Sequence, residues 1–203
     1  MALKVFVKIS TVSNLSDARY CAGMGVDQLG FNFNPSEAQA ISPEKCLEIF
    51  NWVAGVQCVG EFGTMPVEQI ALIQQKLPLD MLETSVIEHV EKVHAFGKPV
   101  SVRIAISHPA ELTQLKAHLS YLDELAEQVV ITSDLPSLYE AITEKLTYYQ
   151  GNIRLIRAFD ISVDNLHHLG NFKGIELKGG YEEKTGLKEY GEVMDLLEAL
   201  DVD

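Results

Sequence analysis

The sequence predicts an α/β protein that folds as a single (β/α)8 barrel (TIM barrel). Short apolar runs alternate with segments of helical period about every 20 to 30 residues, and such alternation is typical of a parallel sheet. The chain of 203 residues lies near the lower end of the usual barrel size, roughly 200 residues and up. The strand candidates number eight, at 3–10, 26–33, 56–62, 79–84, 98–106, 128–132, 152–158 and 173–178.

The first half of the chain supplies four of these strands. The segment 3–10 alternates apolar and polar residues, as a strand does. In "SPEKCLEIFNWV", Ser42 is predicted as the N-cap of a helix and Pro43 as its first residue. Gly25, Gly55 and Gly97 each precede a strand and are predicted to close the preceding helix in the left-handed conformation, as is Gly151 further on.

The second half continues the pattern and decides between two topologies. Leucines at helical spacing predict a helix after 98–106, and "VDNLHHLG" (163–170) predicts a short one of two turns. A doubly wound open sheet is the alternative to a barrel. The strands "NIRLIRAFD" and "FKGIELKGG" favour closure, because each looks complete and about a dozen residues separate them.

Composition predicts one globular domain spanning residues 1–203, in the cytoplasm. The chain is 47% hydrophobic and 22% charged, without a run of membrane-spanning length or a signal-peptide core. The net charge of −13 argues against nucleic-acid and membrane partners, which require a basic surface. Cys21, Cys46 and Cys58 lack metal-site spacing and are expected to be buried, so neither a disulfide framework nor a metal is predicted. The oligomeric state is left open.

The barrel predicts an active site at the carboxyl ends of its strands. In "LKVFVKIS" the apolar side chains would face the helices, which turns Lys8 and Ser10 into the barrel and sets Ser10 at the rim. The same parity turns Arg103, Glu176 and Lys178 inward, while Glu61 and Glu83 end their strands. These charges must be paired, either as an ion-pair network that fills the barrel or as functional groups.

The opening and the end of the chain resemble one family. "FVKISTVSNLSDARYCAGMGVDQLGFNF" with "NPSEAQAISPEKC", and later "KGIELKGGYEEKTGLKEYGEV", are similar to phosphoribosylanthranilate isomerases. The resemblance implies an Amadori rearrangement of a phosphoribosylamine in tryptophan biosynthesis. It also implies a phosphorylated small-molecule ligand and no cofactor, because this reaction is internal acid–base chemistry.

The same resemblance implies that several functional positions have changed. Ser10 stands where the family has its general-base cysteine, and a serine hydroxyl hardly ionises near neutrality. Lys8 would help only if burial made it neutral. Asp134 lies one or two residues after the acid position, where it serves either as the acid or as a helix N-cap. Gln39 replaces a substrate-binding arginine, and the family's Q-L-H-G at the end of the fourth strand has become "ETSV", which gives Glu83 and Ser85.

An anion site is predicted after the last two strands of the barrel. Gly179 and Gly180 allow close approach of a ligand, and Arg157 and Lys178 offer positive charge. The alternative is that the two cations pair with Asp160 or with acidic residues at 182 and 183.

Three functions remain open from sequence. The chain is an isomerase of a phosphorylated sugar derivative, a re-purposed barrel that binds an anionic or phosphorylated small molecule without turnover, or an enzyme of another phosphosugar reaction that uses Glu61, Glu83 and Asp160. The fold alone does not choose among them.

Overall fold

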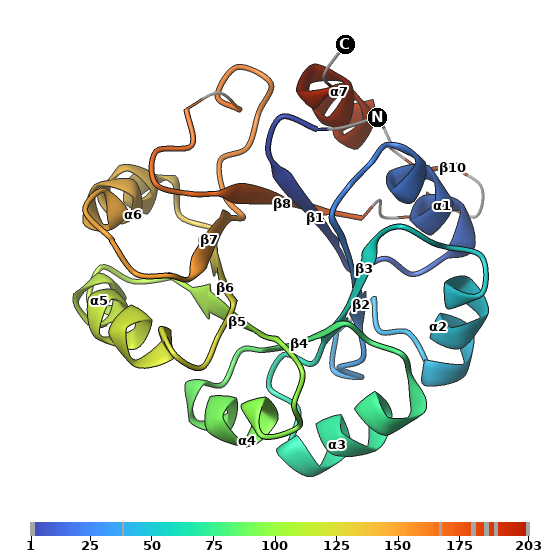
Figure 1. Ribbon diagram of the computed structural model, residues 1–203. Coiled ribbons are helices and arrows are strands. Elements are labelled where there is room, and N and C mark those ends of the chain that lie inside the picture. Colours follow the sequence, from blue (N-terminus) through green and yellow to red (C-terminus); the bar gives the residue numbers. More distant parts are fainter. Residues whose placement is uncertain are drawn as a thin grey trace.

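The computed structural model is a closed barrel of eight parallel strands with helices on its outside (Figure 1). It describes residues 3–37, 39–166, 168–179, 182–184, 187–188 and 191–201. The strands are β1 (Phe6–Ser10), β2 (Gln28–Asn32), β3 (Gln57–Glu61), β4 (Met81–Thr84), β5 (Val100–Ala105), β6 (Gln128–Thr132), β7 (Arg154–Arg157) and β8 (Gly174–Lys178), followed by the short antiparallel pair β9 (Glu182–Lys184) and β10 (Leu187–Lys188).

All eight predicted strands are confirmed, and no end differs from the prediction by more than three residues. The open-sheet alternative is wrong, because β1 pairs in parallel with β8 along its whole length. That pairing sets Lys8 opposite Glu176 and Ser10 opposite Lys178. The first and last strands therefore bring their carboxyl ends to one rim.

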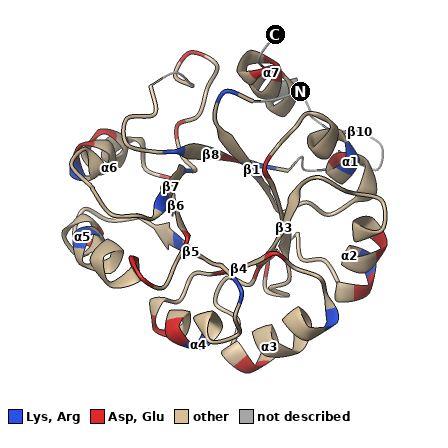
Figure 2. Cartoon of the chain, viewed as in Figure 1, with Lys and Arg blue, Asp and Glu red and all other residues tan. Residues whose placement is uncertain are grey.

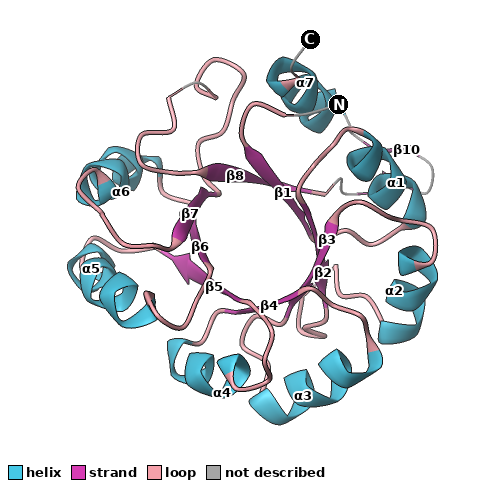
Figure 3. Ribbon diagram, viewed as in Figure 1, coloured by secondary structure: helices cyan, strands magenta, loops and turns pink. Residues whose placement is uncertain are grey.

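The helices form the outer ring around the strands (Figure 3). They are α1 (Leu15–Gly23), α2 (Pro43–Phe50), α3 (Val67–Lys76), α4 (Val90–His94), α5 (Glu111–Leu122), α6 (Tyr139–Leu146) and α7 (Gly191–Leu200), with 3-10 turns η1 (Ile87–His89) and η2 (Pro136–Leu138). Ser42 caps α2 as predicted, because its side chain accepts a hydrogen bond from the Lys45 N–H at 3.2 Å.

Two local predictions are wrong. The described residues of 163–170 form turns and irregular backbone instead of a short helix: the Asn165 side chain accepts the Ser162 N–H, and Gly170 has a φ of +59°. Gly25, Gly55 and Gly97 have positive φ as predicted, whereas Gly151 does not. A Cβ built at Gly151 would overlap the side chain of Tyr149, so this glycine provides space.

The barrel wall separates an apolar layer from a polar interior. Val7, Ile9, Ile175 and Leu177 belong to the buried hydrophobic core, whereas Lys8, between Val7 and Ile9 on β1, is fully buried inside the barrel. The outer helices carry much of the acidic charge, as the red segments of α2, α3 and α4 in Figure 2 show. None of the described helices is long and apolar enough to cross a membrane.

Candidate functional site

A cluster of charged side chains forms the floor of the barrel mouth, and Lys8 lies at its centre. Lys8 is 0% exposed, and its ammonium nitrogen lies 2.8 Å from Glu61 Oε1, 2.6 Å from Glu83 Oε2 and 2.8 Å from Glu176 Oε2. The ammonium donates a hydrogen bond to Glu83 and lies within ion-pair distance of Glu61 and Glu176. Lys8 is therefore enclosed by carboxylates and supports the floor.

Arg103 on β5 is the second cation of this charged floor. Its guanidinium donates two hydrogen bonds to Glu176, at 2.8 and 2.6 Å, and a third to Glu83 at 3.0 Å. Ser101 donates a further hydrogen bond to Glu83 at 2.8 Å. The sequence alternative of an ion-pair network for Lys8, Arg103 and Glu176 is thus what the structure contains.

The charged floor contains two cations and three carboxylates. Because the carboxylates outnumber the cations, their pKa values shift in different directions. Burial opposes ionisation of every member, yet the carboxylates raise the pKa of Lys8 above its ordinary value, so Lys8 stays charged. Arg103 and Lys8 overcome burial at Glu176 and lower its pKa to about 2. At Glu61 burial prevails over Lys8, and its pKa is raised. Lys8 therefore remains protonated, and it cannot act as the neutral base that would assist Ser10.

The three carboxylates are close enough to hold a metal ion, but their surroundings do not suit one. An oxygen from each of Glu61, Glu83 and Glu176 lies within 4.8 Å of the others. The Lys8 ammonium already contacts all three and supplies the positive charge that an ion would bring. The donor set therefore fits an internal lysine better than a metal.

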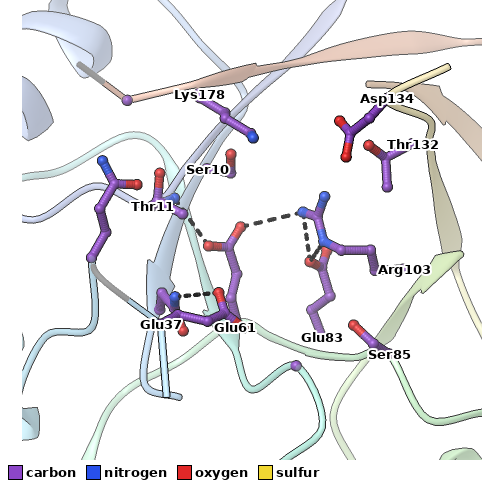
Figure 4. Close-up of a pocket in the computed structure, with 14 residues that line it drawn as sticks. Ser10, Thr11, Glu37, Glu61, Glu83, Ser85, Arg103, Thr132, Asp134 and Lys178 are labelled. Carbon is purple, nitrogen blue, oxygen red and sulfur yellow. Dashed lines mark hydrogen bonds and ion pairs between the residues drawn. The ribbon is translucent and has the colours of Figure 1, made fainter. Parts of the chain in front are cut away.

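A cavity of about 510 Å³ lies above the charged floor, at the carboxyl ends of the strands. Figure 4 shows side chains from several strands pointing into it. Its volume falls within the range of about 300 to 1,000 Å³ that is typical of small-molecule sites. The cavity is lined by Ser10, Thr11, Asn32, Glu37, Gln39, Glu61, Gly63, Glu83, Ser85, Arg103, Thr132, Asp134, Lys178 and Gly179.

Ser10 lines this cavity but is poorly placed for proton transfer. The residue is 2% exposed, and its hydroxyl donates a long hydrogen bond of 3.4 Å to the Leu177 carbonyl. Hydrogen bonds of ordinary strength between oxygens are shorter, near 2.8 Å. No carboxylate or imidazole among the described residues hydrogen-bonds the Ser10 hydroxyl to make it a better base.

Asp134 and Lys178 face the cavity as charged side chains without partners. Both are exposed, and neither makes an ion pair or a side-chain hydrogen bond with another described residue. The predicted alternative of Asp134 as a helix cap is wrong, because the hydroxyl of Ser133 accepts the Leu135 N–H and η2 has no side-chain cap from Asp134. With respect to the described residues, both charges are therefore available to a ligand. The alternative that a cation pairs with the acidic residues at 182 and 183 lies outside the described side chains.

Other predicted binding residues line the same cavity, and several of them already hold partners. Gln39 lines the cavity, and so do Glu83 and Arg103, although both of the latter already hold partners in the charged floor. Gly179 lines the cavity too, but its N–H donates to the Ser10 carbonyl at 2.8 Å and is not free for an anion. Gly180 lies outside the described residues.

Arg157 does not line the cavity. It is 6% exposed, and its guanidinium donates to the Phe159 carbonyl at 3.0 Å and to the Asp160 carboxylate at 2.8 Å. A weaker hydrogen bond reaches the His168 carbonyl at 3.4 Å. The pairing with Asp160 is the alternative that the sequence left open, and it assigns Arg157 to holding the loop after β7.

Thr11 and Glu37 line the cavity but were not predicted as site residues, whereas Glu61, which also lines it, was predicted only as a carboxylate of the alternative phosphosugar reaction. Glu61 carried a usable signal, since it is an acidic residue that ends a strand with inward parity. Thr11 carried none, because its left-handed backbone, with φ of +56°, is not encoded by its residue type. Glu37 is held by the side chains of Asn32 and Asn34 at 2.7 and 3.0 Å, in a loop whose path the sequence does not reveal.

Comparison with known proteins gives related sequences and related structures, although no family model matches the chain. Over 135 residues it is 28% identical to the N-(5'-phosphoribosyl)anthranilate isomerase of Legionella pneumophila (strain Lens). That match covers 66% of this chain and 62% of the relative, which is less than two thirds of the relative's length.

Solved structures match over nearly the whole chain. The phosphoribosyl anthranilate isomerase of Thermus thermophilus has a TM-score of 0.76 and 23% identity, over 96% of this chain and 98% of that one. A phosphoribosyl anthranilate isomerase in complex with reduced 1-(o-carboxyphenylamino)-1-deoxyribulose 5-phosphate has a TM-score of 0.75 and 21% identity, over 97% and 98%. At such identities the structural likeness concerns the barrel fold.

Proposed function

We propose that the chain is a phosphoribosylanthranilate isomerase-like barrel whose mouth binds a phosphorylated ribosylamine and isomerises it to the ketose, a proposal that its similarity to such isomerases supports. The observation that carries this proposal is a pair of charges, Asp134 and Lys178, that have no partner among the described residues and line a cavity of about 510 Å³. A free cation suits the phosphate of such a ligand, and a free carboxyl group suits proton transfer.

The charge of the cavity limits where a phosphate can lie. Its walls hold two cations, Arg103 and Lys178, and four carboxylates, Glu37, Glu61, Glu83 and Asp134. Arg103 is largely neutralised by its glutamates, whereas Lys178 is not. We place the phosphate beside Lys178 at the end of β8, because Lys178 is the cation of the described cavity wall whose charge no described carboxylate neutralises.

Asp134 is assigned the role of general acid in this proposal. It follows β6 and faces the cavity in Figure 4 beside Thr132, with Lys178 on the neighbouring wall. An acid at this position donates a proton to the ring oxygen of the sugar, which opens the ring and leaves a protonated imine. Ring opening is the first half of an Amadori rearrangement, and the second half requires a base.

The direct test is turnover of phosphoribosylanthranilate by the purified full chain. We expect measurable conversion, and we expect the reduced analogue 1-(o-carboxyphenylamino)-1-deoxyribulose 5-phosphate to raise the melting temperature, because a ligand of the native state stabilises it. Anthranilate and unphosphorylated ribose serve as matched control ligands without the phosphate. Absence of both turnover and a melting shift would contradict the proposal.

A second candidate is a barrel that binds the phosphorylated ligand without turning it over. The specific observation in its favour is the weakly bonded hydroxyl of Ser10, which no carboxylate or imidazole of the described residues hydrogen-bonds. This reading predicts a melting shift with the reduced analogue and no conversion of phosphoribosylanthranilate. The same pair of measurements therefore separates the two functions.

A further inference from the structure

Ser10 leaves the proposed reaction without a base, and the structure offers another group nearby. We propose that Glu61 is the proton-exchanging group of the cavity and the general base of the isomerisation. This inference rests on the proposed function for its substrate class, the open-chain imine of a phosphorylated aldose. It assigns the base to β3 instead of β1.

Glu61 reaches the β1 side of the mouth from the end of β3. The Thr11 N–H, next to Ser10 in the chain, donates a hydrogen bond of 3.0 Å to Glu61 Oε2. Figure 4 shows the Glu61 carboxylate between Thr11 and Arg103, on the cavity side of the charged floor. The side chain is 8% exposed and lines the cavity, so a ligand there can touch it.

The neighbouring strand is shaped for this carboxylate. Gly30 on β2 has no side chain, and a Cβ built there would overlap the Glu61 carboxylate. Thr11 donates its N–H to Glu61 from a backbone with positive φ, a conformation that is uncommon outside glycine. Two separate features of β2 and β1 thus hold the Glu61 carboxylate in the mouth.

Glu61 is the most weakly held carboxylate of the charged floor. Glu83 accepts hydrogen bonds from Lys8, Ser101 and Arg103, and Glu176 accepts two from Arg103 besides its contact with Lys8. Glu61 accepts one, from Thr11, while its Oε1 accepts no hydrogen bond from the described residues and has ion contacts with Lys8 at 2.8 Å and Arg103 at 3.8 Å. A proton that enters the charged floor therefore binds Glu61 at the least cost.

The electrostatics agree with this assignment. Burial raises the pKa of Glu61, the carboxylates of Glu83 and Glu176 raise it further, and the cations Lys8 and Arg103 oppose the rise. A carboxyl group with a raised pKa is a better base near neutral pH than an ordinary one, because its affinity for the proton is higher. Both Glu83 and Glu176, in contrast, have lowered pKa values because of the two cations.

The step itself is a proton transfer without any oxidant or reductant. Glu61 takes the proton from C2 of the protonated imine, so the C2–H bond breaks and its electron pair forms the C1–C2 double bond. The π pair of the C=N bond moves to nitrogen, which neutralises the imine. The resulting enaminol loses its hydroxyl proton and gains a proton at C1, which gives the ketose without net change in protons.

The test compares Glu61→Gln and Glu61→Asp with the matched control Glu176→Gln, in the full-length chain. Glu176→Gln removes a carboxylate of the same charged floor that does not line the cavity. Two quantities are measured: turnover of phosphoribosylanthranilate, and the titration of the glutamate carboxyls by 13C NMR. Binding of the reduced analogue, followed by melting temperature, reports whether each variant keeps its site.

We expect Glu61→Gln to lose about 10²- to 10⁴-fold in turnover while it still binds the analogue, because that is the usual range for general acid–base catalysis. Glu61→Asp keeps a carboxylate and should recover part of the loss. Wild type should show one glutamate that titrates above the ordinary range, and this signal should vanish in Glu61→Gln but persist in Glu176→Gln.

The possible failures are distinguishable. Wild-type turnover that survives in Glu61→Gln, or a glutamate titration that Glu61→Gln leaves unchanged, overturns the assignment. An inactive wild type overturns the proposed function instead, and the assignment of Glu61 as the proton-exchanging group is then decided by the NMR titration alone. If Glu61→Gln does not fold, Glu61→Asp and the wild-type titration decide in its place, and equal behaviour of Glu61→Asp and wild type at a normal pKa counts against the assignment.

Discussion

Lys8 and Lys178 occupy neighbouring strands and face the same barrel interior, yet their surroundings differ completely. Lys8 is 0% exposed and contacts three carboxylates within 2.8 Å. Lys178 lies two residues nearer the rim on β8, opposite Ser10, and is exposed without an ion-pair partner among the described residues. Two positions along paired strands therefore separate a lysine that neutralises buried carboxylates from a lysine that is exposed at the rim.

The comparison teaches that depth in the barrel assigns the role of a charge. Below the rim the protein must neutralise each charge internally, since an unpaired buried ion costs several kcal/mol. At the rim, water solvates Lys178 and Asp134, so both can remain without partners until a ligand arrives. Glu61 lies between these levels, which is why it combines an ion contact below with access to the cavity above.

The largest expected effect is that of Lys8→Met on stability. This substitution leaves three buried carboxylates facing one another, and breaking a buried ion pair in this way costs about 3–5 kcal/mol. The matched variant Lys178→Met should change the free energy of unfolding by less than about 0.5 kcal/mol, because the side chain is exposed and has no ion-pair partner among the described residues. Urea denaturation at neutral pH measures both. Equal losses of unfolding free energy in the two variants would contradict the different roles assigned to the charged floor and the rim.

The pH dependence of stability should come from the charged floor. The pKa of Glu176 is lowered to about 2 and that of Glu83 is lowered too, so the stability they contribute is complete above their ordinary pKa and is lost as the pH falls toward 2. The raised pKa of Glu61 has the opposite sign: its contribution is complete below the ordinary value and is lost as the pH rises through the folded value.

We therefore expect the wild type to lose a few kcal/mol between about pH 5 and pH 2, and Glu176→Gln to show a flatter profile over that window. Denaturant titrations at successive pH values measure this. An unchanged slope in Glu176→Gln would mean that other carboxylates cause the acid sensitivity.

At the rim, Asp134→Asn should reduce turnover by at least about 100-fold, as expected when a general acid is removed. The free energy of unfolding should change by less than about 0.5 kcal/mol, because the carboxylate has no partner among the described residues. Steady-state kinetics beside urea denaturation check both expectations. A loss of stability without loss of turnover would mean that Asp134 supports the fold and is not the general acid.

The smallest effect concerns ligand affinity. Lys178→Met should weaken binding of the reduced analogue about tenfold, since a hydrogen bond to a charged group contributes about 1.5–3 kcal/mol and 1.4 kcal/mol corresponds to a factor of ten. Lys116→Met, at an exposed position on α5, is the matched control and should bind as the wild type does. Equal affinities in all three proteins would place the phosphate away from β8.

The sequence was sufficient for the barrel and for the direction of the strand side chains. Alternation in "LKVFVKIS" and "KGIELKGG" determines which side chains face inward, because successive side chains of a strand point to opposite faces. For that reason Lys8, Glu176 and Arg103 were expected inside the barrel, and they are. The depth at which each lies, and hence which lysine is free, depends on strand register across the barrel.

Long-range geometry explains what the sequence did not reveal. Three glutamates from β3, β4 and β8 meet one lysine, although up to 168 positions of chain separate Lys8 from Glu176. Arg157 was predicted to bind an anion because it ends β7, but its guanidinium donates hydrogen bonds to the nearby carbonyls of Phe159 and Asp160. Asp134 resembled a helix cap, but the Ser133 hydroxyl made the local hydrogen bond. In each case competition between neighbours decided the role.

The central claim is that the barrel mouth binds a phosphorylated sugar derivative between Lys178, Asp134 and Glu61. A crystal structure of the chain with reduced 1-(o-carboxyphenylamino)-1-deoxyribulose 5-phosphate tests this claim most directly. The account predicts the phosphate within hydrogen-bond distance of Lys178 Nζ and the C1–C2 unit of the sugar beside the Glu61 carboxylate. A ligand bound elsewhere, or with its phosphate on another wall of the cavity, would contradict it.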